Sequence, residues 1–151
     1  MAESPPRAAA MYRVQRRLGF LGAASFALTC VNGFGIFYAF NDPLLHKNYA
    51  FAHKTTMAGF FTCAAIAAII PLSDIEGPGL DRFIFWWEYC IWVQNLSVTA
   101  ATLWPKRVCM RGLTGDCLND FIVFHLAFSA IPTTLLGGWL AYALRTKQPK
   151  T

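Results

Sequence analysis

The sequence predicts an all-α integral membrane protein, a four-helix bundle with short loops and both termini on the same, inner side. Two observations support this prediction. Hydrophobic residues make up 56% of the 151 residues and charged residues only 14%, whereas soluble domains average about 25% charged residues. The apolar residues also form four continuous blocks, which is the pattern of spanning helices rather than of the alternating strands of a membrane barrel.

The first block covers residues 18–40 and carries no charge. A spanning helix needs roughly 17–25 mainly apolar residues, so this block predicts the first transmembrane helix. It is longer than the apolar core of a typical signal peptide, and no convincing A-x-A cleavage site follows it. We therefore expect an uncleaved helix, preceded by a mobile basic tail over residues 1–17.

The remaining blocks cover residues 50–72, 80–104 and 121–144, and complete a transmembrane domain over residues 18–144. The second block is charged only at its start. The fourth has Pro132 near its middle, and a proline inside a helix removes one backbone hydrogen bond and favours a kink. A basic tail over residues 145–151 ends the chain.

Charge distribution predicts the orientation. Four spans place eight Lys and Arg residues on the side of the termini and five on the opposite side, so the positive-inside rule puts the termini in the matrix or cytosol. The Arg-rich start with one acid favours the mitochondrial inner membrane. The net charge of +5 lies mainly at helix ends, without the basic, aromatic-interleaved face typical of nucleic-acid binding.

Polar residues inside the predicted spans are candidates for a site. On a helix, Glu88, Asn95 and Thr99 recur at steps of seven and four and therefore share one face. That face is expected to point into the bundle because hydrocarbon penalises polar groups. Asn32 is the corresponding residue of the first span. Judged by depth, Glu88 should either pair with an arginine at the inner end, for which the candidates are Arg16, Arg17 and Arg145, or be protonated because of desolvation.

Two histidines lie toward the outer leaflet. His125 is expected to approach Asn32, Asn95, Thr99 or His53. Three hypotheses account for this cluster: interhelical hydrogen bonds that fix packing, a pocket for a quinone, lipid or sterol, or a b-type haem held by His53 and His125. The first is favoured, because His53 lies close to the water interface and no flanking pattern supports a haem.

Two cysteines, Cys109 and Cys117, lie in the predicted outer loop. In an oxidising compartment they could close that loop with a disulfide, and otherwise they are unpaired thiols. No metal site is expected, because two soft ligands at this spacing are not a metal motif.

Small residues recur every fourth position in three of the blocks and allow helix backbones to approach closely. These small-residue ridges contain Gly19 and Ala23; Gly59, Cys63 and Ala67; and Ala130, Thr134 and Gly138. Packing within the bundle is the favoured role, and docking on a partner's helix is the alternative.

The sequence contains no nucleotide-binding loop, zinc-protease motif or nucleophile elbow. The leading hypothesis is therefore a non-enzymatic accessory subunit of a respiratory or photosynthetic assembly. Its expected partners are other membrane subunits and structural lipids, and no cofactor is expected apart from the haem alternative. With short loops, inner termini and two cysteines in the outer loop, the chain also resembles MARVEL-type four-helix proteins. That resemblance implies a membrane-organising or trafficking role.

Overall fold

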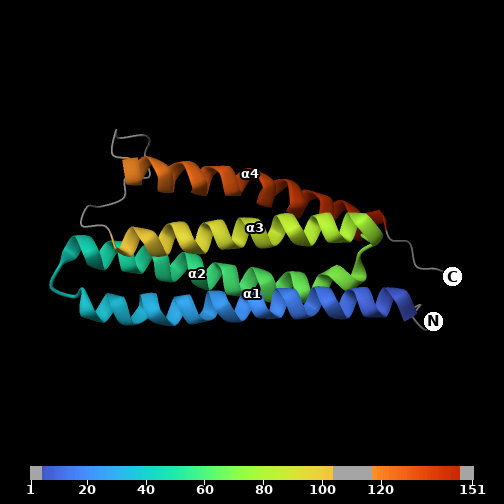
Figure 1. Cartoon of the computed structure of the whole chain (residues 1–151), viewed down its shortest axis with the longest axis horizontal. Coiled ribbons are helices and arrows are strands. Elements are labelled where there is room, and N and C mark those ends of the chain that lie inside the picture. Colours follow the sequence, from blue (N-terminus) through green and yellow to red (C-terminus); the bar gives the residue numbers. More distant parts are fainter. Residues whose placement is uncertain (1–4, 104–116, 147–151) are drawn as a thin grey trace.

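The computed structural model describes residues 5–103 and 117–146, which form helices and short turns without any strand. In chain order these are α1 (Pro5–Tyr38), α2 (Pro43–Ile69), the 3-10 turn η1 (Ile70–Leu72), α3 (Gly77–Thr102) and α4 (Cys117–Thr146). Consecutive helices run antiparallel, so α1 begins and α4 ends at the same end of the bundle (Figure 1). The predicted all-α class and the shared end are therefore confirmed for the described residues.

Local chemistry sets the connections between the helices. Asp42 caps α2, its carboxylate accepting from the backbone N–H groups of Leu44 at 3.0 Å and Leu45 at 3.1 Å, and proline follows at the first helical position. Pro71 cannot continue an α-helix, and the chain tightens into η1 there. Gly77 adopts a positive φ of 54°, which other residues rarely tolerate, and α3 begins at this residue.

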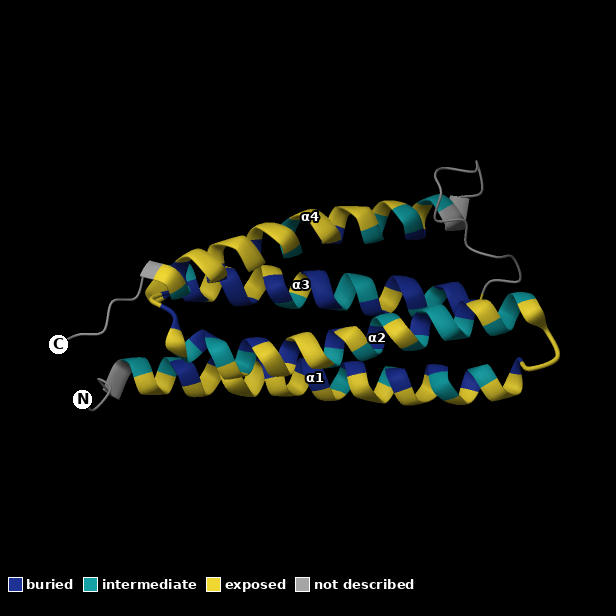
Figure 2. Cartoon of the chain, turned by 180° about the vertical axis from the view of Figure 1, so that it is seen from behind, coloured by how far each residue is buried: buried dark blue, intermediate teal, exposed yellow. Residues whose placement is uncertain are grey.

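Three helical segments are long and apolar enough to cross a membrane: Arg7–Tyr38, Pro43–Leu72 and Asp120–Arg145. The predicted third span, residues 80–104, is not among them. Its helix, α3, carries Asp81, Arg82 and Glu88 besides two amides and is therefore less apolar. In the structure α3 packs against α1, α2 and α4 (Figures 1 and 2). Of its polar groups, Asn95 is fully buried between these helices, whereas Asp81 and Arg82 stay exposed near the start of α3.

The prediction of a mobile tail over residues 1–17 is wrong for its described part, because α1 begins at Pro5. Met11 and Val14 are buried and continue the stripe formed by Leu18 and Leu21. These positions recur at steps of three and four, the period of a packed helix face. The Arg7 guanidinium also donates to the Ser73 carbonyl at 3.0 Å, which ties the start of α1 to the turn before α3.

The three small-residue ridges have different surroundings. The ridge of α2 packs inside the bundle, where a methyl group added at Gly59 would lie 3.2 Å from the Asn95 side-chain oxygen, and Cys63 is fully buried. By contrast, a methyl group added at Gly19 or Gly138 would meet no atom within 4 Å. Packing within the bundle therefore accounts for the α2 ridge but leaves the ridges of α1 and α4 facing outward.

Close approach of α1 and α2 at Gly35 gives a test of this packing. A methyl group at this position would overlap the Tyr49 ring, so Gly35→Ala should lower the free energy of unfolding by about 1–3 kcal/mol through overpacking. Gly19→Ala is the matched control, since its methyl group meets open space and alanine favours the helix by up to about 1 kcal/mol. Titration with a denaturing detergent, monitored by circular dichroism, measures the free energy of unfolding of both variants. Equal shifts in the two variants would contradict the packing described here.

Candidate functional site

Two polar features lie on α1, α2 and α3. One is an interior polar cluster, and the other is a groove at the end of the bundle where α1 begins. The cluster comprises Ser25, Thr29 and Asn32 of α1, His53 and Thr56 of α2, and Asn95 and Thr99 of α3. It joins the three helices through side-chain hydrogen bonds.

Asn95 connects α3 to α1. Its amide donates to the Ser25 hydroxyl at 2.7 Å, and that hydroxyl donates to the Leu21 carbonyl at 2.9 Å. Both Asn95 and Ser25 are fully buried. The Asn95 side-chain oxygen faces Gly59 of α2 and has no hydrogen-bond partner among the described residues. The absence of a side chain at Gly59 is what leaves room for this oxygen.

Thr29 connects α1 to α2. Its hydroxyl donates to the Thr56 hydroxyl at 2.9 Å, which in turn donates to the Ala52 carbonyl at 2.9 Å. Nδ1 of His53 lies 2.8 Å from the Thr29 carbonyl. The His53 ring packs against Gly33, where an added methyl group would lie 3.1 Å from Nδ1. His53 therefore bridges two helices at a point of close backbone approach.

Asn32 and Thr99 form the remaining link of the cluster. The Asn32 amide donates to the Thr99 hydroxyl at 3.4 Å, and Asn32 is fully buried. Its side-chain oxygen, like that of Asn95, has no partner among the described residues. The predicted inward face of Asn32, Asn95 and Thr99 is confirmed.

The predicted approach of His125 to this cluster is wrong. Nδ1 of His125 lies 2.8 Å from the Phe121 carbonyl of its own helix, and its ring contacts Phe121 at 3.9 Å between centroids. Buried positions of α4 recur at Ile122, Ser129 and Leu136, and His125 lies at the edge of this stripe. Because α4 packs chiefly on α3, its histidine is held among aromatic rings of α4 instead.

The haem hypothesis needs His53 and His125 to face each other. The two rings contact backbone carbonyls of different helices, α1 for His53 and α4 for His125. No hydrogen bond or ring contact joins them in residues 5–103 and 117–146. The sequence prediction for Cys109 lies outside the described residues, as does the side chain of Cys117, so their pairing stays a prediction.

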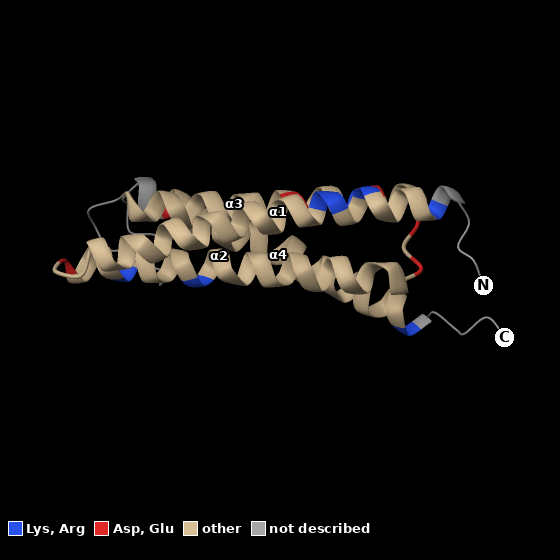
Figure 3. Cartoon of the chain, turned by 90° about the horizontal axis from the view of Figure 1, so that it is seen from below, with Lys and Arg blue, Asp and Glu red and all other residues tan. Residues whose placement is uncertain are grey.

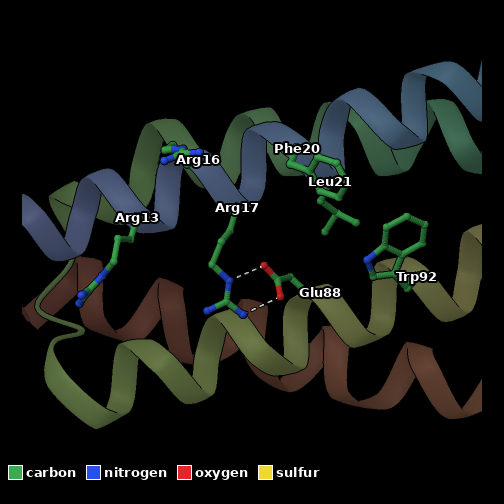
Figure 4. A pocket seen from close by; sticks show the side chains of 7 residues that line it. All are labelled: Arg13, Arg16, Arg17, Phe20, Leu21, Glu88 and Trp92. Atoms are coloured by element: carbon green, nitrogen blue, oxygen red, sulfur yellow. Dashed lines mark hydrogen bonds and ion pairs between the residues drawn. The ribbon is translucent and has the colours of Figure 1, made fainter.

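The second feature is a groove of about 520 Å³ between the first turns of α1 and the middle of α3. We call it the arginine groove, and it is lined by Arg13, Arg16, Arg17, Phe20, Leu21, Glu88 and Trp92. Figure 4 shows Arg17 reaching across from α1 to Glu88 on α3, with Trp92 one turn further along α3.

Arg17 and Glu88 form a bidentate ion pair. The Arg17 Nε lies 2.7 Å from Oε1 of Glu88, and Nη2 lies 2.6 Å from Oε2. A planar guanidinium matches a carboxylate in this fork geometry, which is stronger than a single charged hydrogen bond. The prediction that Glu88 pairs with one of the inner-end arginines is confirmed.

The groove has an excess of positive charge. Three arginines and one glutamate line it, for a formal net charge of +2. Arg13 and Arg16 are exposed and form no hydrogen bond or ion pair with a described residue. Figure 3 shows basic residues of α1 gathered near the end of the bundle where that helix begins.

Sequence reasoning missed Ser25, Thr29 and Thr56 as members of the interior polar cluster. The first two precede Asn32 by seven and three residues, and so lie on the same helix face. That spacing was a usable signal. Threonine and serine are easily overlooked because their hydroxyls also lie within reach of the preceding helical turn. The Ser25 and Thr56 hydroxyls donate there, and the Thr29 hydroxyl lies 2.8 Å from the Ser25 carbonyl.

No protein-family model, characterised protein or solved structure matches the chain. The chemistry of the site must therefore be taken from its own residues. The interior polar cluster consists of hydroxyls, amides and one imidazole already engaged with neighbouring helices. Such groups orient helices in a medium without water.

The threonine link gives a matched pair of substitutions. Thr56→Val keeps the side-chain shape but removes the acceptor for Thr29, so we expect the free energy of unfolding to fall by about 1 kcal/mol. Thr62→Val is the control, because the Thr62 hydroxyl bonds only to carbonyls of its own helix. It should change stability by less than about 0.5 kcal/mol. The same detergent titration measures the free energy of unfolding of both variants. An equal loss of stability in Thr62→Val would contradict an interhelical role for the Thr56 hydroxyl.

Proposed function

We propose that the chain is a non-enzymatic, membrane-embedded subunit of a larger membrane assembly and that α4 is its main contact with a neighbouring subunit. The observation that supports this proposal is the incomplete covering of α4. Within the most apolar 18-residue stretch of α4, the buried share is only 17%, whereas it is 28% in the corresponding stretches of α1 and α2. α4 packs chiefly on α3 and leaves its other faces open (Figure 2).

The uncovered surface of α4 has a shape suited to a helix. Ala130, Thr134 and Gly138 are all exposed and recur at steps of four, so they form a shallow ridge along one face. Small residues allow two helix backbones to approach closely, and lipid chains fill such a surface less well than a facing helix does. A second subunit placed there would complete the packing of α4.

The polar residues inside the bundle fit the same proposal. Their hydrogen bonds hold α1, α2 and α3 together and thereby fix the position of α3, on which α4 rests. A fixed scaffold with one open helix is the arrangement expected of an accessory subunit. A respiratory assembly of the mitochondrial inner membrane remains the favoured setting, on the strength of the Arg-rich start and the positive-inside bias.

Leucine substitution of outward glycines tests the proposed contact. Gly138→Leu should leave the helical content unchanged, since its position is open in the isolated subunit, but should block close approach of a partner. We expect the association constant of the complex to fall about 5–30-fold, as for the loss of about 1–2 kcal/mol of helix contact, and the fraction of the chain found in a large complex to fall with it. Native electrophoresis of membranes extracted in mild detergent measures this fraction.

Gly19→Leu is the matched control, because Gly19 is equally open but lies on α1. It should leave the complex intact. Loss of the complex in Gly19→Leu alone would assign the contact to α1 and overturn the role of α4. Migration of the unmodified chain as a lone small particle would overturn the proposal of an assembly subunit.

A further inference from the structure

We propose that the arginine groove binds one anionic glycerophospholipid, with its phosphate on Arg13 and Arg16 and an acyl chain along Phe20 and Trp92. This inference rests on the membrane location in the proposed function but not on the contact through α4. It is supported by the unpaired charge in the groove, the apolar residues beside that charge, and the depth at which the two meet.

The charge of the groove is available to a ligand. Glu88 already engages Arg17 through both carboxylate oxygens, so that pair contributes no net charge. Arg13 and Arg16 have no partner among the described residues, and both are exposed and line the groove. A planar guanidinium group can donate two parallel hydrogen bonds to two oxygens of one phosphate. A phosphate is therefore the anion best matched to these two side chains.

The apolar half of the groove continues directly from the charged half. Phe20 and Leu21 follow Arg17 by about one helical turn on α1, and Trp92 follows Glu88 by one turn on α3. Phe20 is 70% exposed and so is free to contact an acyl chain. A ligand that fills the groove must therefore be anionic at one end and apolar at the other.

The depth of the arginines agrees with a lipid rather than a water-soluble anion. Tyr38 follows Arg17 by 21 helical positions, which is about 32 Å at 1.5 Å per residue. The hydrocarbon layer of a membrane is about 30 Å thick. When Tyr38 lies at one boundary, Arg17 therefore lies at the other, at the level of lipid phosphates, and the exposed Phe20 lies among acyl chains.

The Arg17–Glu88 pair limits the charge that is available to the ligand. It withdraws one guanidinium, because both carboxylate oxygens of Glu88 engage Arg17. Neutralising Glu88 should therefore release Arg17 and remove a negative charge, so that the anion binds more tightly.

Native mass spectrometry of the full chain in neutral detergent tests the inference. An equimolar mixture of phosphatidylglycerol and phosphatidylcholine supplies the anionic and zwitterionic lipids. We expect the bound ratio to favour phosphatidylglycerol by about thirtyfold, from about fivefold for each of two arginines at a membrane surface. Equal binding of the two lipids would overturn the inference.

Matched substitutions locate the site. Arg13→Gln combined with Arg16→Gln should abolish the preference. Arg82→Gln combined with Arg145→Gln removes the same charge from exposed positions outside the groove and should change the ratio by less than about twofold. An equal loss in both pairs would mean that general charge, not the groove, selects the lipid. Glu88→Gln should raise phosphatidylglycerol binding, and circular dichroism checks that each variant keeps its helices.

The source of the phosphate is tested separately. Glycerol 1-phosphate in large excess should not displace the bound lipid, because it lacks the acyl chains that fill the apolar half of the groove. Displacement would show that the groove binds the free anion and would overturn the lipid assignment. Retention of the chain in the membrane after alkaline carbonate washing checks its membrane location. A chain that is retained but shows no preference for phosphatidylglycerol would contradict the lipid site and leave the proposed function standing.

Discussion

The packing of α3 against the other three helices is the contact on which this structure depends. Among the described helices of the bundle, α3 alone is not apolar enough to cross a membrane, and it carries Glu88 and Asn95. Asn95 is fully buried and donates to Ser25 of α1, and Glu88, at the edge of the arginine groove, is paired with Arg17 of α1. The position of α3 beside α1 thus gives both polar groups a partner.

The interior divides into two regions with different ways of holding the helices together. Near the end where α1 begins, Met11, Leu18, Ile84 and Trp87 belong to a buried apolar core. Further along, the interior polar cluster joins α1, α2 and α3 by hydrogen bonds. The two regions together fix three helices and leave α4 attached mainly through α3.

The sequence was sufficient to predict what depends on composition and on spacing along one helix. Four apolar blocks predicted the all-α class, and the spacing of Glu88, Asn95 and Thr99 predicted their shared face. Depth limited the partner of Glu88 to an inner-end arginine but left a protonated Glu88 as the alternative, and the structure shows the pair with Arg17. The start of α1 was missed although Met11, Val14 and Leu18 carry a helical period, because the arginines between them resembled a solvated tail. The charge of these arginines was thus given more weight than the helical spacing of the apolar residues between them.

The rotation of α4 about its own axis could not be predicted, and the misplacement of His125 follows from that. A helix that is apolar on every side has no amphipathic pattern to indicate which face meets its neighbour. In the structure Ile122, Ser129 and Leu136 face inward, and His125 lies beside that stripe. Its ring contacts Phe121 and Phe124 instead of the amides of the interior polar cluster. Much of α4 is uncovered in the structure, and this open surface is the one to which the proposed function assigns a neighbouring subunit.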